Sequence, residues 1–420
     1  MGWEEEGFRM RKWPDDFINK IICGDCMEIM KEIPKNSIDA IVTDPPYGLE
    51  FMGKEWDRLE GTIGEIKNKN MRLPSNLGNK RNVKCPDCGK WIYDHHPREC
   101  QCGGVYRLKQ RKMQLWHTQW LKEAFRVLKP GASMLAMGGT RTFHRLMVAI
   151  EDSGFIIKDT LMWLYGSGFP KAQDLTNMLK KRGIETDKWQ GYKIGGIKPA
   201  YEPIVWAVKP PEGSYIDNVL KWGVGAVNVD ECRIGFKQTD NIITKNPHTR
   251  TKGTDAYQTH CYGKYNPKED FIDYTKSKGR FPANVILDEE AGRLLDEQSN
   301  ASRFFYCAKA SRAERNAGLE DLKEKSKHYR WNKAGRWTND TSPTKNHHPT
   351  VKPIKLFEWL IKLITREEQI VLDPFIGSGT TAIASFRVGR KYIGIEREKE
   401  YIKIAEERLA QGILKNDEAE

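Results

Sequence analysis

Two short motifs, each directly after an apolar run, constrain the fold of this chain more than any other feature. The tetrapeptide loop, Asp44-Pro45-Pro46-Tyr47, follows the run 38–43, and the glycine loop, Asp373-Pro374-Phe375-Ile376-Gly377-Ser378-Gly379-Thr380, follows the run 369–372. Apolar runs of this length predict buried strands. Since open α/β sheets bind ligands at the carboxyl ends of their strands, we expect both loops at one edge of one sheet.

The rest of the pattern predicts an α/β fold: a doubly wound, mostly parallel, Rossmann-like sheet. Strands at 21–23 and 38–43 flank a helix whose apolar face is Cys26, Ile29, Met30 and Ile33. Near the other end, the ranges 356–364, 370–372, 381–388, 392–395 and 401–409 alternate helix and strand. A helix at 116–128, a strand at 133–137 and a helix at 143–151 lie between these ends. The β-rich ranges 155–165 and 203–208 predict an antiparallel pair at the edge of the sheet.

Composition divides the chain into three parts. The predicted core is 1–47, 113–209 and 354–420, and it is nearly neutral. The insert 48–112 has 14 basic and 8 acidic residues, and the range 210–353 has 24 and 19. Positive charge outside the core favours a polyanionic partner, although a soluble basic protein without one would look the same. The chain has no apolar run of membrane-spanning length and no signal-peptide pattern at its start, so we expect an intracellular protein without a membrane partner.

The glycine loop has the features of a nucleotide site. Gly377 and Gly379 stand where a strand turns into a helix, and there the backbone can approach a ligand closely. Glu396 lies 23 positions after Asp373, at the end of the next predicted strand, where an acid can bind ribose hydroxyls. Pro374 and Phe375 replace the first glycine of a dinucleotide fingerprint, which argues against NAD. The alternative is a tight turn with an exposed glutamate.

The tetrapeptide loop suits chemistry on a nucleobase amine, whose lone pair is delocalised into the ring. If Asp44 accepts one N–H and the carbonyl of Pro45 accepts the other, the nitrogen moves toward sp³ geometry and becomes more reactive. Pro46 stiffens the loop. Tyr47 offers a face on which an extruded base can stack. The alternative is a rigid turn with no such role.

Together, the two loops resemble those of the S-adenosylmethionine-dependent amino-methyltransferases of DNA, specifically the permuted β-class in which the catalytic motif precedes the cofactor motif. The resemblance makes Asp44, Pro45, Pro46 and Tyr47 the catalytic residues. It places Glu396 at the cofactor's ribose, Asp25 at its adenine, and Lys352, within the stretch 348–353, at its methionine moiety. The full set of cofactor residues implied is Asp25, Lys352, Asp373, Phe375, Gly377, Ser378, Gly379, Thr380 and Glu396.

The resemblance implies methylation of adenine N6 in double-stranded DNA, with one base flipped out of the helix. Within the family, aspartate at the start of the tetrapeptide is commoner for adenine and serine for cytosine N4, so cytosine N4 is the nearest alternative. Further alternatives are an RNA or protein amine methyltransferase and a non-catalytic, zinc-containing nucleic-acid binder. The family also implies a cytoplasmic prokaryotic or phage-encoded enzyme, a place in restriction-modification, and a homodimer as one assembly.

Four cysteines in the insert have the spacing of a zinc ribbon. The pairs Cys85/Cys88 and Cys100/Cys102 are separated by eleven residues, and a glycine follows each pair. This predicts a structural zinc ion with four thiolate ligands, with chance clustering as the alternative. Cys23 and Cys26 have no partner pair, and we expect two buried thiols or a mildly reactive pair.

The family's target-recognition domain lies between the two motifs, in the position of residues 210–353. Within that range, 327–337 alternates basic residues with tryptophan and histidine, a composition that can bind phosphates and stack on bases. A solvated surface loop would have the same composition.

Overall fold

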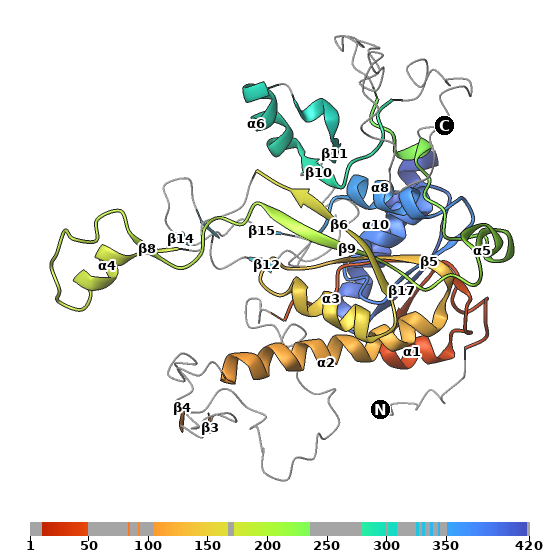
Figure 1. Ribbon diagram of the computed structural model, residues 1–420, viewed down its shortest axis with the longest axis horizontal. Helices are drawn as coiled ribbons and strands as arrows, with labels where there is room; N and C mark the ends of the chain where they lie inside the picture. The colour runs from red at the N-terminus through yellow and green to blue at the C-terminus, as the bar shows by residue number, and fades with distance from the viewer. Residues whose placement is uncertain are drawn as a thin grey trace, which may run out of the picture.

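Figure 1 shows the computed structural model of the chain, which describes residues 11–48, 104–166, 172–235, 279–299, 301–308 and 351–417 and six two-residue strand segments between them. One large sheet forms the centre, with helices on both faces. Within these residues, no helix combines the length and apolar character needed to cross a bilayer.

The central sheet is mixed and mostly parallel, as the sequence predicted. Every neighbouring pair of strands is parallel except the two pairs that include β9. The nine strands lie in the order β1 (Lys20–Cys23), β17 (Lys391–Glu396), β16 (Ile370–Asp373), β2 (Ile38–Thr43), β5 (Leu128–Met137), β9 (Tyr201–Val208), β6 (Ile156–Leu164), β10 (Val285–Asp288) and β11 (Tyr306–Ala308).

The predicted antiparallel pair exists, but its predicted place at the edge is wrong. β6 and β9 pair antiparallel over their full lengths, and β10 and β11 then extend the sheet beyond β6. Both added strands come from the range 210–353. They escaped prediction because they are short, with four and three residues, and the surrounding sequence shows weak periodicity.

Helices cover both faces of the sheet, as expected for a doubly wound fold. One layer lies on the face toward the bottom of Figure 1 and consists of α1 (Cys26–Glu32), α2 (Gly104–Val127) and α3 (Phe143–Asp152). The other layer consists of α8 (Ile354–Ile364), α9 (Thr380–Arg387) and α10 (Lys399–Asp417). The predicted boundary between insert and core, at residue 112, falls inside α2.

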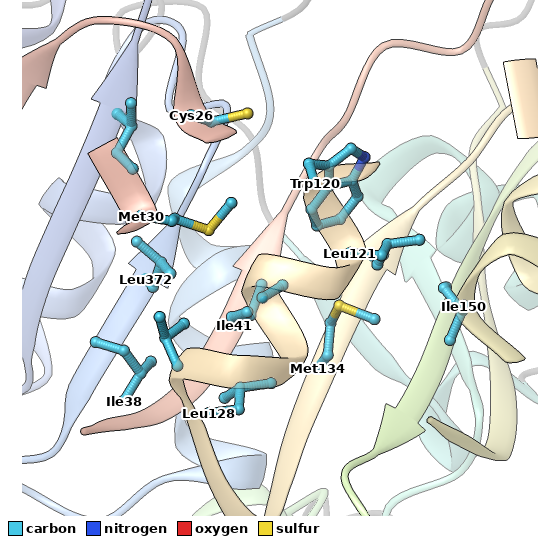
Figure 2. Packing of buried hydrophobic residues seen from close by; sticks show 14 of the residues in the cluster. Cys26, Met30, Ile38, Ile41, Trp120, Leu121, Leu128, Met134, Ile150 and Leu372 are labelled. Atoms are coloured by element: carbon cyan, nitrogen blue, oxygen red, sulfur yellow. The ribbon is translucent and has the colours of Figure 1, made fainter. Parts of the chain in front are cut away.

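The core explains why these segments form these elements. All six residues of β2 are buried, which is why its sequence is mostly apolar without alternation. Its buried aspartate, Asp39, forms an ion pair with Lys129 of β5. Trp120 and Leu121 of α2 and Met30 of α1 are fully buried against the first face (Figure 2). The apolar face predicted for α1 is confirmed, since Cys26, Ile29, Met30 and Ile33 are all buried.

The remaining elements lie outside these two helical layers. They are helices α4 (Leu175–Lys180), α5 (Tyr215–Trp222) and α6 (Glu289–Ser299), the 3₁₀ turns Asp230–Cys232 and Ala301–Phe304, and the paired short strands β3 (Val83–Lys84) with β4 (Trp91–Ile92), β7 (Gln173–Asp174) with β8 (Lys193–Ile194), β12 (Lys325–Ser326) with β15 (Pro343–Thr344), and β13 (Arg330–Trp331) with β14 (Trp337–Thr338).

Candidate active site

The tetrapeptide loop and the glycine loop leave the same edge of the sheet side by side. β2 and β16 are parallel neighbours, with Leu372 in register with Ile41. The last residue of β2, Thr43, donates its hydroxyl to Asp373 Oδ1 at 2.6 Å. The prediction that the two motifs share one sheet edge is therefore confirmed, although 330 residues separate the two hydrogen-bonded residues.

The glycine loop turns β16 into α9 through two residues of positive φ. Gly377 has φ of 51° and Gly379, which caps α9, has φ of 82°. A Cβ atom on Gly379 would lie 2.9 Å from the Cβ of Ala405 in α10. Both the backbone conformation and the close approach of α10 therefore require glycine at position 379.

Asp373 organises this loop from within. Its buried carboxylate accepts hydrogen bonds from the hydroxyls of Thr43 and Thr381 and from the backbone N–H of Phe375, the last at 3.0 Å. Burial raises the pKa of Asp373 to about 6, against the lowering effect of these three hydrogen bonds. These hydrogen bonds to the Asp373 carboxylate therefore fix the conformation of the glycine loop where it leaves β16.

Two further acids stand at the neighbouring strand ends. Glu396 ends β17, and its Oε2 accepts the N–H of Gly377 at 3.0 Å while its Oε1 accepts the N–H of Glu398 at 2.9 Å. Burial raises the pKa of Glu396. Asp25 follows β1 and caps α1 by accepting the N–H of Met27 at 2.9 Å. Because β1, β17 and β16 are parallel neighbours, both acids lie at the same edge of the sheet as the glycine loop.

A cavity of about 930 Å³, including its open mouth, joins these groups. Eight of the nine residues predicted to bind the cofactor line it; Gly379 does not. Those eight are Asp25, Lys352, Asp373, Phe375, Gly377, Ser378, Thr380 and Glu396. Asp44 and Pro46 of the tetrapeptide loop line the same cavity, and so do Trp116 and Tyr401, which sequence reasoning missed.

The chemistry of this lining fits S-adenosylmethionine. Carboxylates at one end, Asp25 and Glu396, can accept hydrogen bonds from ribose hydroxyls and amines. The aromatic rings of Phe375 and Trp116 offer apolar faces. Asp44 lies where the tetrapeptide loop meets the cavity, so a methyl group presented there would face that loop.

Asp44 is engaged by two donors. Its Oδ1 accepts the hydroxyl of Tyr47 at 2.7 Å, and its Oδ2 forms an ion pair with Nζ of Lys352. Glu202, the second residue of β9, completes the cluster: its Oε2 lies 3.2 Å from the Tyr47 hydroxyl and 3.4 Å from Lys352 Nζ. The cluster therefore contains two carboxylates, one ammonium group and one phenol.

Lys352 offsets one of the two carboxylate charges in this cluster, which leaves the cluster negative by one charge. Burial opposes the charge on Lys352, but the carboxylates of Asp44 and Glu202 outweigh that effect and raise its pKa. Burial and the same two carboxylates raise the pKa of Tyr47, so its phenol stays protonated and donates. Lys352, which we predicted at the cofactor's methionine moiety, lines the cavity but also binds the aspartate of the tetrapeptide loop. Nothing in the sequence distinguished Glu202 from any other polar strand residue.

Helix α2 packs against the glycine loop, and its Trp116 lines the same cavity as Pro46 of the tetrapeptide loop. The rings of Trp116 and Trp120 lie 5.8 and 5.1 Å from the ring of Phe375. Between them, His117 is fully buried and accepts the indole N–H of Trp120 on Nδ1 at 3.0 Å, which places the imidazole proton on Nε2. Nε2 is buried without a hydrogen-bond partner within the described residues. Burial lowers the pKa of His117 to about 3.

The four predicted zinc ligands, Cys85, Cys88, Cys100 and Cys102, lie outside the described residues, so the zinc site stays a prediction. β3 and β4 pair on either side of the first cysteine pair, with Lys84 in register with Trp91. Within the described part of the chain, no cluster of three or more histidine, cysteine or acidic residues could hold a metal.

Of the two cysteines near the first strand, only Cys26 is buried, and burial raises its pKa. Cys23 is exposed, so the expectation of two buried thiols is wrong. The reason is that Cys23 ends β1, an edge strand of the sheet. Most of the basic and aromatic segment 327–337 lies outside the described residues, apart from the backbone pairing of β13 with β14.

Comparison with known proteins adds an independent line of information. A family model described as DNA methylase, of the N6/N4 type, matches residues 38–407. The type II methyltransferase M.HindIII of Haemophilus influenzae is 27% identical over 406 residues, which cover 95% of this chain and 97% of that protein. The type II methyltransferase M.HpaI of Haemophilus parainfluenzae is 22% identical over 391 residues, covering 93% and 74%.

Solved structures of similar proteins also exist. A complex of M1.HpyAVI with SAM is 17% identical, with a TM-score of 0.37 over 93% of this chain and 98% of that chain. PvuII DNA methyltransferase, described as cytosine-N4-specific, is 16% identical, with a TM-score of 0.42 over 93% and 85%.

Proposed function

Because this chain belongs to the N6/N4 DNA methylase family and is an S-adenosylmethionine-dependent DNA methyltransferase, we propose that its target is the N6 amino group of adenine in double-stranded DNA. The choice of adenine rests on Asp44, the residue commoner at this position in the adenine enzymes that the chain resembles. The relatives named type II methyltransferases favour a role in modification alongside a restriction enzyme.

One observation carries the proposal: Asp44 and the glycine loop line one cavity, and their strands are direct neighbours. A methyl donor held by the glycine loop and a base presented to Asp44 would meet there. Bringing two reactants together in this way removes much of the entropic barrier to transfer. The bound cofactor supplies an electrophilic methyl group on a positively charged sulfur.

Asp44 acts on the amine. Its Oδ1 and Oδ2 are occupied by Tyr47 and Lys352, so an incoming N–H would replace or share one of these donors. The carbonyl of Pro45 takes the second N–H. The new N–C bond would form as the cofactor's S–C bond breaks, which would leave a neutral thioether and a positively charged nitrogen. The Asp44 carboxylate, fixed in place beforehand, would stabilise that charge without reorganising and would accept the proton that the nitrogen loses.

Tyr47 and Lys352 position this carboxylate. The Tyr47 hydroxyl lies 2.7 Å from Asp44 Oδ1 and 3.2 Å from Glu202 Oε2, so its single proton is held between two acceptors, which anchors the end of the ring on which the extruded base would stack. The Nζ atom of Lys352 lies 5.6 Å from the centre of that ring and forms ion pairs with both Asp44 and Glu202. Recognition of the target sequence by residues 210–353, and a structural zinc ion in the insert, remain parts of the same proposal.

Nucleoside analysis tests the proposal directly. The protein is incubated with duplex DNA and cofactor carrying an isotopically labelled methyl group, and the DNA is digested and separated by mass. We expect label in N6-methyl-2′-deoxyadenosine. Label in N4-methyl-2′-deoxycytidine would overturn the choice of base but not the proposed active site. Label in RNA or protein but never in DNA would overturn the choice of substrate.

A further inference from the structure

Residues 172–200, which connect β6 to β9, form a separate projection that we call the arm. It contains β7, β8 and α4, and Figure 1 shows it extending away from the body of the molecule. None of its 29 residues is buried. The arm therefore has no hydrophobic core, and the active site described above does not use it.

The arm is nevertheless held in a definite conformation. β7 pairs with β8, the backbone N–H of Leu175 donates to the carbonyl of Tyr192 at 3.1 Å, and the hydroxyl of Thr176 donates to the carbonyl of Trp189 at 3.1 Å. The rings of Trp189 and Tyr192 meet edge to face at 5.4 Å and are 37% and 60% exposed. Aromatic rings displayed to solvent on a coreless element suit a partner that stacks or packs on them.

The arm is also basic. It has six basic residues and three acidic ones. Of the acids, Asp174 caps α4 through the N–H of Asn177 and lies 4.0 Å from Lys193, so it is already used within the arm. The side chains of Lys180, Lys181 and Arg182 are exposed at the end of α4 and form no ion pair within the described residues. This excess of exposed positive charge complements a polyanion.

The arm leaves the sheet at the edge that carries the active site. β6 and β5 both run antiparallel to β9, so the carboxyl end of β6 lies at the same edge as that of β2. The base of the arm is closed by a hydrogen bond of 2.9 Å from Tyr165 N–H to the carbonyl of Ala200. Two residues further on, Glu202 contacts Tyr47 of the tetrapeptide loop.

We propose that the arm binds the DNA duplex that presents the target base, with its basic residues on phosphates and with Trp189 and Tyr192 packed against the sugars or the exposed base edges. This surface lies outside residues 210–353, where we placed target recognition. The inference rests on the DNA methyltransferase activity and not on the choice of adenine. It makes the arm a second contact with DNA, whose base lies two residues from Glu202 in the catalytic cluster.

The test compares two triple variants of the full-length protein. The arm variant is Lys180→Ala, Lys181→Ala and Arg182→Ala. The control variant removes the same charge from exposed lysines away from the active-site edge: Lys20→Ala at the start of β1, Lys35→Ala before β2 and Lys122→Ala near the end of α2. Binding of fluorescent duplex DNA is measured over a range of salt concentrations, and cofactor binding is measured by calorimetry.

We expect the arm variant alone to lose DNA affinity. For each lysine–phosphate or arginine–phosphate interaction that is removed, the slope of log affinity against log salt concentration should become shallower by about 0.9. Binding at about 0.1 M salt should weaken by up to about eightfold for each such interaction. Cofactor affinity should not change in either variant. A Trp189→Ala and Tyr192→Ala double variant should also bind DNA more weakly, but with an unchanged salt slope, because no charge is removed.

Three outcomes would overturn the inference. Equal DNA affinity and slope in the wild type, the arm variant and the aromatic variant would remove the arm from DNA binding and leave the methyltransferase function intact. A change in sedimentation mass without a change in DNA affinity would assign the arm to contact with a second copy of the chain. Failure of the wild type to bind or methylate any DNA would overturn the function together with the inference.

Discussion

Replacing His117 by glutamine should reduce the pH dependence of stability by a predictable amount. The buried imidazole has a pKa of about 3, whereas histidine in the unfolded chain titrates near 6.5. Between these values the unfolded chain binds a proton that the folded chain does not, so the free energy of unfolding falls as the pH drops below about 6.5. With about 1.4 kcal/mol for each pH unit, His117 lowers stability by about 2 kcal/mol between about pH 7.5 and about pH 5.

This magnitude depends little on the folded pKa, provided that it lies below about 4. Asp373 acts in the opposite direction. Its pKa is raised to about 6 in the folded chain, so the folded chain takes up its proton first, and acidification through that range adds stability. The total pH dependence therefore mixes these two groups with others, among them Glu396, whose pKa burial also raises. The difference between the wild type and the His117→Gln variant isolates the histidine.

Urea unfolding followed by tryptophan fluorescence, at about pH 7.5 and about pH 5, measures the effect. The variant should be less stable than the wild type at about pH 7.5 because it disturbs the hydrogen bond from Trp120. The difference in the free energy of unfolding between the two pH values should nevertheless change by about 2 kcal/mol relative to the wild type. His144→Gln, at an exposed position on α3, serves as the control: partial burial and Arg145 lower the pKa of His144 as well, but less than burial lowers that of His117, so this variant should shift the difference in the same direction by a smaller amount. An unchanged difference in the His117 variant would refute the assignment of a buried neutral imidazole.

Other variants test the site itself. Asp44→Ala should abolish methyl transfer while cofactor and DNA binding persist; retention of more than about a tenth of the wild-type turnover, under ~1.4 kcal/mol, would contradict its role. Glu396→Ala and Gly377→Val should each weaken S-adenosylmethionine binding in calorimetry by roughly tenfold or more, the first by losing acceptors and the second by forcing a branched side chain into positive φ. Unchanged affinity in both would remove the cofactor role of the glycine loop. The purified protein should contain about one zinc ion, and Cys85→Ser with Cys88→Ser should release it while sparing cofactor affinity; metal analysis without zinc in protein prepared free of chelators would discard the site.

The sequence predicted the parts of the molecule where several local signals coincide. β2 and β16 are apolar runs that end in distinctive loops, and their shared edge followed from the rules of parallel sheets. Eight of nine predicted cofactor residues line one cavity for the same reason. Strong helical periodicity likewise fixed α8 and α9 to within two residues.

What the sequence could not predict depends on contacts across the fold. Glu202 looks like any acid near the start of a strand, and only the pairing of β9 brings it to Tyr47. His117 stands in an apolar helical face, where its neutral state depends on burial from all sides. β10 and β11 add to the sheet on the side of β6 that β9 does not occupy. A four-residue strand such as β10 contains no local signal for which strand it will pair with.

The hydrogen bond between Thr43 and Asp373 has a consequence for how a newly made enzyme becomes active. The 330 residues between them take roughly 16 to 66 s to synthesise at about 5–20 residues per second. Until β16 and β17 emerge from the ribosome, β1 lacks its sheet partner, and β2 lacks its neighbour on that side. A growing chain or a truncated product therefore carries the tetrapeptide loop without a cofactor site. Modification of DNA can begin only after β16 and β17 have been synthesised.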